Sequence, residues 1–78
     1  MKELVLAQLE QGEQATVVTL QGGQGLQHRM RSVGLKEGQA LRVVAKHHFS
    51  GPLVVAVGRR HVTIGRGMAQ KIGVLRQA

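Results

Sequence analysis

The sequence predicts a mostly β domain, a small barrel of about five short strands with one short helix inserted after the first strand. Apolar, β-branched runs recur between glycine-containing turns, roughly every eight to twelve residues, which is typical of small barrels. Residues 24–33 instead place Leu26, Met30 and Val33 at i, i+4 and i+7, the spacing of one helix face. The chain has 78 residues, enough for one thin core. We therefore expect a single domain over residues 1–78.

The composition of each segment predicts where the strands lie. Residues 14–20 are rich in β-branched side chains, and an extended or single-turn lead-in precedes them. From residue 40 onward apolar and polar residues alternate, so Leu41, Val43 and Ala45 are expected to share one face. The expected strands are Gln14–Leu20, Ala40–His48, Leu53–Val57, His61–Gly65 and Gly73–Arg76.

Glycine and proline predict where these elements end. Gly34 stands where a left-handed cap would end the helix, with Leu35 placed to fold back against it. Gly38 belongs to a polar turn that leads into the next strand. Gly51 and Pro52 together break the strand pattern.

The last part of the chain predicts one helical turn followed by a closing strand. The turn is expected over residues 67–72, with Ile72 on its buried side and Ala69 helping to dock it. Gly73 lies where a strand normally carries a side chain, so it is expected to weaken the closing strand.

The charge of the chain indicates an acidic partner. Eleven Lys and Arg residues oppose four acidic residues, which gives a net charge of +7. A surface this basic suits nucleic acid, an anionic membrane face or an acidic patch on a protein. There is no cysteine, and no serine or lysine lies in an activating motif. The sequence therefore predicts a protein that is not an enzyme and that requires no cofactor.

The apolar runs are short. The longest uninterrupted one, Leu53–Val57, is far below the roughly 20 residues of a membrane-spanning helix. The first residues lack the apolar core of a signal peptide. We therefore expect a soluble, cytoplasmic protein.

Three short motifs follow one another along most of the chain. A helix leads into G-L-x-x-G and an alternating strand, a G-P-L turn opens the next strand, and an A-x-x-I-x-V segment closes the chain. Their order and spacing resemble the FeoA family of small SH3-like barrel proteins. The motif positions are Gly34, Gly38, Gly51, Pro52, Ala69 and Ile72, and each has a structural role.

The resemblance implies a non-catalytic accessory protein of bacterial ferrous iron uptake. Its implied partner is the membrane transporter FeoB, which carries a G-protein domain in the cytoplasm. The protein would then lie at the inner face of the membrane through its partner, as a monomer or weak homo-oligomer. The candidate docking residues are Leu26, Met30 and Leu35 around the helix, with the cations Arg29, Arg31, Arg42, Arg59 and Arg60. The alternative for the apolar side chains is that they fill the barrel.

Two other functions remain open. A basic barrel could bind nucleic acid non-specifically through phosphate contacts, although Phe49 is the only aromatic residue available for base stacking. The protein could also be a transition-metal-responsive module. His47, His48 and His61 are weak candidate ligands, with His61 facing one of the other two across the sheet. They suggest at most weak or adventitious binding of a divalent metal.

Overall fold

A computed structural model describes residues 2–47 and 50–77 as an antiparallel sheet with two short α-helices. Two elements of the described part occupy the predicted lead-in: a two-residue strand and a 3-10 turn. The elements are β1 (Leu4–Val5), the 3-10 turn η1 (Leu6–Gln8), β2 (Gln14–Leu20), α1 (Gln24–Ser32), β3 (Ala40–Lys46), β4 (Leu53–Val57), β5 (Arg60–Ile64), α2 (Arg66–Ala69) and β6 (Ile72–Arg76).

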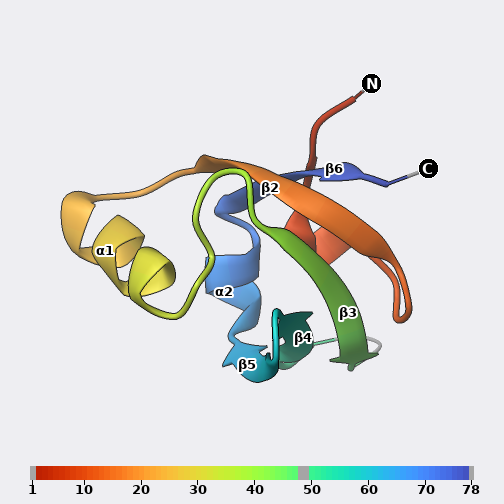
Figure 1. Cartoon of the computed structure of the whole chain (residues 1–78). Coiled ribbons are helices and arrows are strands. Elements are labelled where there is room, and N and C mark those ends of the chain that lie inside the picture. The colour runs from red at the N-terminus through yellow and green to blue at the C-terminus, as the bar shows by residue number, and fades with distance from the viewer. Residues whose placement is uncertain (1, 48–49, 78) are drawn as a thin grey trace.

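The strands form one curved sheet in the order β1-β6-β2-β3-β4-β5. The last strand therefore lies between the first two, pairing with β1 on one side and β2 on the other. Figure 1 shows the sheet curving around α2, which joins β5 to β6, while α1 projects to one side. The mostly β, barrel-like class predicted from the sequence is confirmed.

The core is entirely apolar among the described residues. Every strand except the two-residue β1 contributes at least one buried side chain, and so do η1 and both helices. The fully buried residues include Leu6, Val17, Met30, Leu35, Val55, Ala69, Ile72 and Val74. Ile72 lies in β6 rather than in the predicted helical turn, because α2 ends at Ala69.

The end of α1 has the predicted glycine cap. Gly34 has a φ of +97°, a left-handed conformation that only glycine adopts without strain. Its N–H donates to Arg31 O at 3.0 Å, and the N–H of Leu35 donates to Met30 O at 2.9 Å. These two bonds define a Schellman motif, and its usual apolar contact joins Leu35 to Met30. The prediction that Leu35 folds back against the helix is confirmed.

Strand β3 departs from the predicted alternation. The pairing of β3 with β4 shifts in register between Val43 and Ala45, and such a bulge turns the following side chains over. Ala45 is therefore exposed while Leu41 and Val43 are buried, and the prediction that the three residues share one face is wrong. Lys46 instead donates its Nζ to the carbonyl oxygens of Ala7 at 2.9 Å and Leu9 at 2.7 Å. The strand ends at Lys46; His48, included in the predicted strand, lies outside the described residues.

Gly73 lies at a crowded point of the closing strand. It is buried opposite Thr19 in β2. A methyl group added there would lie 3.0 Å from Thr19 Cβ and closer still to a carboxylate oxygen of Glu3. Strand β6 runs through Gly73 from Ile72 to Arg76, and glycine fits this crowded point because it carries no side chain. The effect of Gly73 on the stability of the strand stays a prediction.

Candidate functional site

A chain of polar side chains ties α1 to the sheet. The side-chain amide of Gln27 donates to Leu20 O at 3.2 Å and to Gly22 O at 3.0 Å. Its oxygen accepts a bond from Arg31 Nη1 at 3.3 Å, and Arg31 Nη2 pairs with Glu37 at 2.9 Å. Arg31 therefore supports the helix and the loop that follows it, and its charge is already paired.

Four cations surround the C-terminal end of α1, and we call them the α1 basic cluster: Arg29, Arg31, Lys36 and Arg60. Arg60 comes from β5, yet a methyl group at Gly34 would lie only 3.5 Å from its Nη2. The hairpin of β4 and β5 thus brings a distant cation to the helix end, where the free carbonyls favour positive charge.

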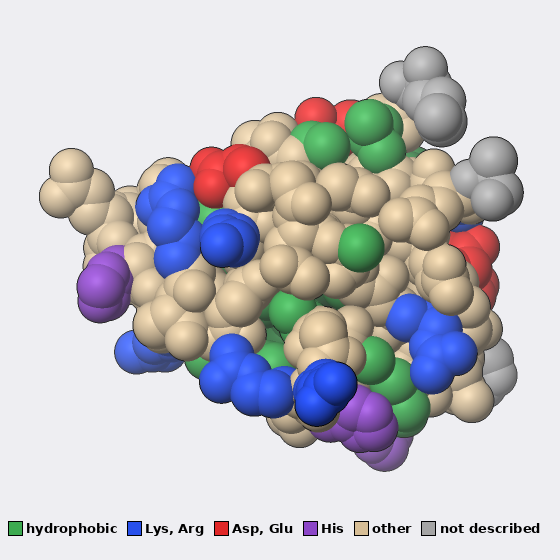
Figure 2. Space-filling model, viewed as in Figure 1, with side chains coloured by type: hydrophobic (Ala, Val, Ile, Leu, Met, Phe, Trp, Pro, Cys, Tyr) green, Lys and Arg blue, Asp and Glu red, His purple; other side chains and the backbone are tan. Residues whose placement is uncertain are grey.

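The charges of this cluster are only partly compensated. Glu37 is its acidic residue, and the pKa of Glu37 is lowered by a hydrogen bond from its own backbone N–H and by Arg31. Arg29 and Arg31 are two positions apart, so they point to different sides of the helix. Arg29, which is exposed, is therefore more available to a partner than Arg31. In the view of Figure 2, Lys and Arg side chains lie along the left and lower margins of the molecule.

The sequence also places its carboxylates unevenly. The four acidic residues are Glu3, Glu10, Glu13 and Glu37. Residues 38–78 contain no Asp or Glu, and their cations are Arg42, Lys46, Arg59, Arg60, Arg66, Lys71 and Arg76. Two of these are bound back to the first part of the chain, Lys46 to Glu10 at 3.5 Å and Arg76 to Glu13 at 3.1 Å.

The candidate docking residues do not form one surface. Met30 and Leu35 are fully buried, so they fill the barrel and cannot offer a side chain to a partner. Leu26 is half-buried against the core. Arg42 lies on the outer face of the sheet, opposite Gln14 on one side and Ala56 on the other.

The other two candidate cations come from the hairpin of β4 and β5. Arg59 lies in the turn between β4 and β5, and Arg60 is the first residue of β5, one residue before the expected start of this strand at His61. Of the predicted set, Arg29, Arg31 and Arg60 are brought to the same helix end.

The histidines do not converge. His61 is opposite Ala56 in β4, whereas His47 follows Lys46, whose partner is Leu53 at the other end of that strand. Three residues of strand separate these positions by about 10 Å. The predicted approach of His61 to His47 is therefore wrong, and His48 lies outside the described residues. Within the described ranges no three His, Cys, Asp or Glu side chains are grouped as a metal site would require.

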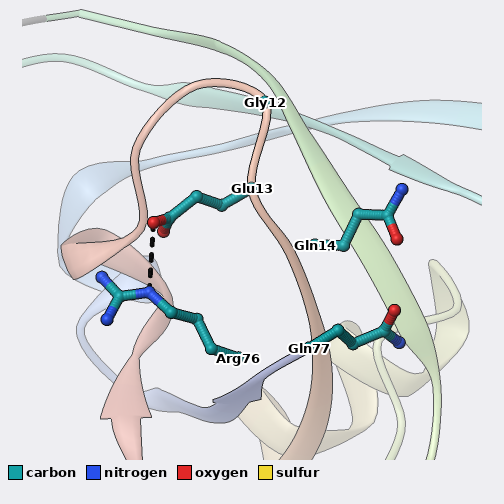
Figure 3. Close-up of a pocket in the computed structure, with 5 residues that line it drawn as sticks. All are labelled: Gly12, Glu13, Gln14, Arg76 and Gln77. Atoms are coloured by element: carbon teal, nitrogen blue, oxygen red, sulfur yellow. Dashed lines mark hydrogen bonds and ion pairs between the residues drawn. The ribbon is translucent and has the colours of Figure 1, made fainter.

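An open depression of about 290 Å³ lies at the end of the sheet (Figure 3). It is lined by Gly12, Glu13, Gln14, Arg76 and Gln77. The pKa of Glu13 is lowered, first by the backbone N–H of Glu10 and also by Arg76. The two charged groups of the depression already bind each other, so we assign it a structural role. No pattern in the sequence indicates this pair, because its members are 63 residues apart.

No helix in the described ranges is long and apolar enough to cross a membrane.

The family model and a curated relative identify the family of this chain. The FeoA domain model matches residues 4–76. A protein of Methanocaldococcus jannaschii named as an Fe(2+) transport protein A is 33% identical over 69 residues, which cover 88% of this chain and 82% of that protein. A crystal structure of an iron uptake regulatory protein, FeoA, has a TM-score of 0.90 at 28% identity, covering 97% of this chain and all of the other.

A further solved relative describes the fold. The zinc complex of FeoA from Stenotrophomonas maltophilia has a TM-score of 0.78 at 25% identity, covers 92% of this chain and 89% of that one, and is described as a prokaryotic SH3 domain protein. The match of the sequence and the likeness of the fold thus both indicate one family. The chain is an SH3-like member of the FeoA family of ferrous iron transport accessory proteins.

Proposed function

We propose that this protein is a non-catalytic, cytoplasmic adaptor that docks on the FeoB-like transporter at the inner face of the membrane. Its contact there would be an acidic patch of the transporter's G-protein domain. The observation that carries the proposal is the α1 basic cluster, where Arg29, Lys36 and Arg60 surround a helix end with Glu37 as the compensating carboxylate. Complementary charge fixes orientation and speeds association.

The expected contact differs from the one the sequence suggested. Met30 and Leu35 are buried, so the apolar part of the contact is limited to the half-buried Leu26 and Val33. Arg31 would contribute mainly by holding the loop at Glu37. The exposed Arg29 and the hairpin residue Arg60 would carry the charge contacts.

Binding of the purified transporter G-protein domain to two matched variants tests the proposal. Arg29→Glu and Arg42→Glu make the same change in net charge, but Arg29 lies on α1 and Arg42 on the outer face of the sheet. We expect Arg29→Glu to weaken binding at least about tenfold, or roughly 1.4 kcal/mol, with a smaller effect of Arg42→Glu. Equal losses would mean that net charge alone drives binding. No loss in either variant, with the folded state intact, would remove the α1 basic cluster from the proposal.

The alternative functions have less support. A transition-metal-responsive module would need convergent ligands, and His47 and His61 lie at opposite ends of β4. Non-specific nucleic-acid binding remains compatible with the net charge of +7. It predicts an affinity that falls steeply with salt and responds equally to Arg29→Glu and Arg42→Glu.

A further inference from the structure

Strand β5 is an edge of the sheet. It pairs with β4 along its whole length, from Val57 opposite Arg60 to Leu53 opposite Ile64, and no second strand pairs with it in the described part of the chain. A two-residue turn joins Val57 directly to Arg60, so the backbones of these two residues form a hydrogen-bonded pair. Hydrogen-bonded and non-bonded pairs alternate from there.

This alternation leaves His61 and Thr63 with outward backbone groups. Arg60, Val62 and Ile64 use their N–H and C=O groups toward β4, and the groups of His61 and Thr63 point to the free edge. Both residues are exposed. The edge therefore offers two N–H donors and two C=O acceptors in the spacing that an added strand needs.

The side chains along the edge also alternate. His61 shares a row with Ala56 and Arg42, whose exposed side chain marks the outer face of the sheet. Val62 shares a row with Val55 and Val43, which are buried, so the half-buried Val62 belongs to the inner face. An added strand would place one residue beside Val62 on the apolar side and its two neighbours on the outer face.

The ends of this edge are cationic. Arg59 and Arg60 lie at one end, and Arg66 follows β5 at the other, where its Nη2 donates to His47 O at 2.6 Å. Residues 38–78 supply no carboxylate to compensate them. A second copy of the chain would bring the same three cations to the same edge, which disfavours self-pairing. An acidic strand would be attracted.

We propose that the free edge of β5 binds an extended acidic segment of a partner protein by strand addition. Acidic residues lie opposite His61 and Thr63, and an apolar residue lies opposite Val62. The pattern recognised is thus acidic–apolar–acidic in an extended conformation. This inference does not rest on the proposed function, because the backbone groups that it uses belong to β5 and not to α1, and it is tested without the transporter. The two surfaces share one cation, Arg60, which also belongs to the α1 basic cluster.

The probe is a peptide of about seven residues that alternates Glu and Val, with blocked ends. Its binding to the isotope-labelled protein is followed by the backbone amide signals. We expect saturable shifts at His61 and Thr63 and slowed hydrogen exchange of their amides. A peptide with Lys in place of Glu is expected to bind at least about tenfold more weakly, since it brings positive charge to an edge whose two ends are already cationic.

Two variants of one residue separate strand addition from charge attraction. Thr63→Pro removes the outward N–H without removing a bond to β4, and proline is tolerated on an edge strand in this orientation. Thr63→Ala keeps the N–H. We expect Thr63→Pro to lose at least about tenfold in peptide affinity, the equivalent of one hydrogen bond, while Thr63→Ala binds as the parent does.

If Thr63→Pro disturbs the fold, the same test is made with the parent protein and a peptide that is methylated on alternate backbone nitrogens. This peptide keeps its charge but cannot form backbone hydrogen bonds with β5. Equal binding by the methylated peptide, or shifts confined to α1, would overturn the proposal. So would a concentration-dependent dimer that Thr63→Pro dissociates, since it would assign the edge to a second copy.

Discussion

Residues 1–37 and residues 38–78 use charge in opposite ways. The first part contains all the carboxylates of the chain, and three of the four form ion pairs. The second part has cations alone. Lys46 and Arg76 are held by carboxylates of the first part, whereas Arg42 and Arg59 are exposed without such a pairing in the described residues. Net charge therefore overstates the basic surface that is available to a partner, because some of the cations are structural.

Lys46 offers the sharpest test of this difference. Its Nζ donates to two carbonyl oxygens of the segment after β1, those of Ala7 and Leu9, and its side chain is 11% exposed. Lys46→Met keeps the length of the side chain but leaves both carbonyls without their donor. We expect a loss of about 3 kcal/mol in the free energy of unfolding, measured by urea denaturation.

The matched control for Lys46→Met is Arg42→Met on the same strand. Arg42 is exposed, so its substitution should change stability by less than about 0.5 kcal/mol. Similar losses in the two variants would contradict the division into structural and available cations.

A substitution at Gly73 tests the region where the two parts of the chain meet, because β6 of the second part lies between β1 and β2 of the first. Gly73→Ala would press a methyl group against Thr19 and the Glu3 carboxylate. We expect this overpacking to lower the unfolding free energy by about 2 kcal/mol. Gly25→Ala is the control, because Gly25 lies in α1 with open space around it. It should raise the melting temperature, as alanine favours a helix by about 0.8 kcal/mol.

The smallest expected effect is a dependence of stability on pH in the acid range. It comes from the carboxylates of the first part. The pKa values of Glu13 and Glu37 are lowered in the folded protein from the ordinary value of 4.5. Their contribution is therefore complete above pH 4.5 and is lost as the pH falls through the lower folded values. The double variant Glu13→Gln with Glu37→Gln should lose less melting temperature between pH 6 and pH 3 than the parent. An unchanged slope would show that these ion pairs do not contribute.

Local signals in the sequence predicted most of the fold. The pair Gly34 and Leu35 predicted the end of α1, because a Schellman motif needs only neighbouring residues. Ala45 was misplaced because a bulge depends on the partner strand and leaves no mark in the alternation. The crowding around Gly73 escaped the sequence for a similar reason, since the side chains that would meet a methyl group there come from Glu3 and Thr19, far away in the chain.

The candidate site was harder to predict than the fold. Apolar side chains on a helix can equally fill a core or contact a partner, and the burial of Met30 became evident only with the packing. The cations were easy to find, but the sequence could not tell which were paired. The contribution of Arg60 to the end of α1 depends on the hairpin that carries it there. Family resemblance supplied the functional class, which no residue pattern could have given.

The position of β6 between β1 and β2 also has a consequence for synthesis on the ribosome. The two strands made first find their shared neighbour only when residues 72–76 have emerged. Until then the growing chain can form the hairpins of β2 with β3, β3 with β4 and β4 with β5, but it cannot close the barrel. Closure therefore waits for residues 72–76, and until they have emerged the apolar interior of the nascent protein is open to chaperones.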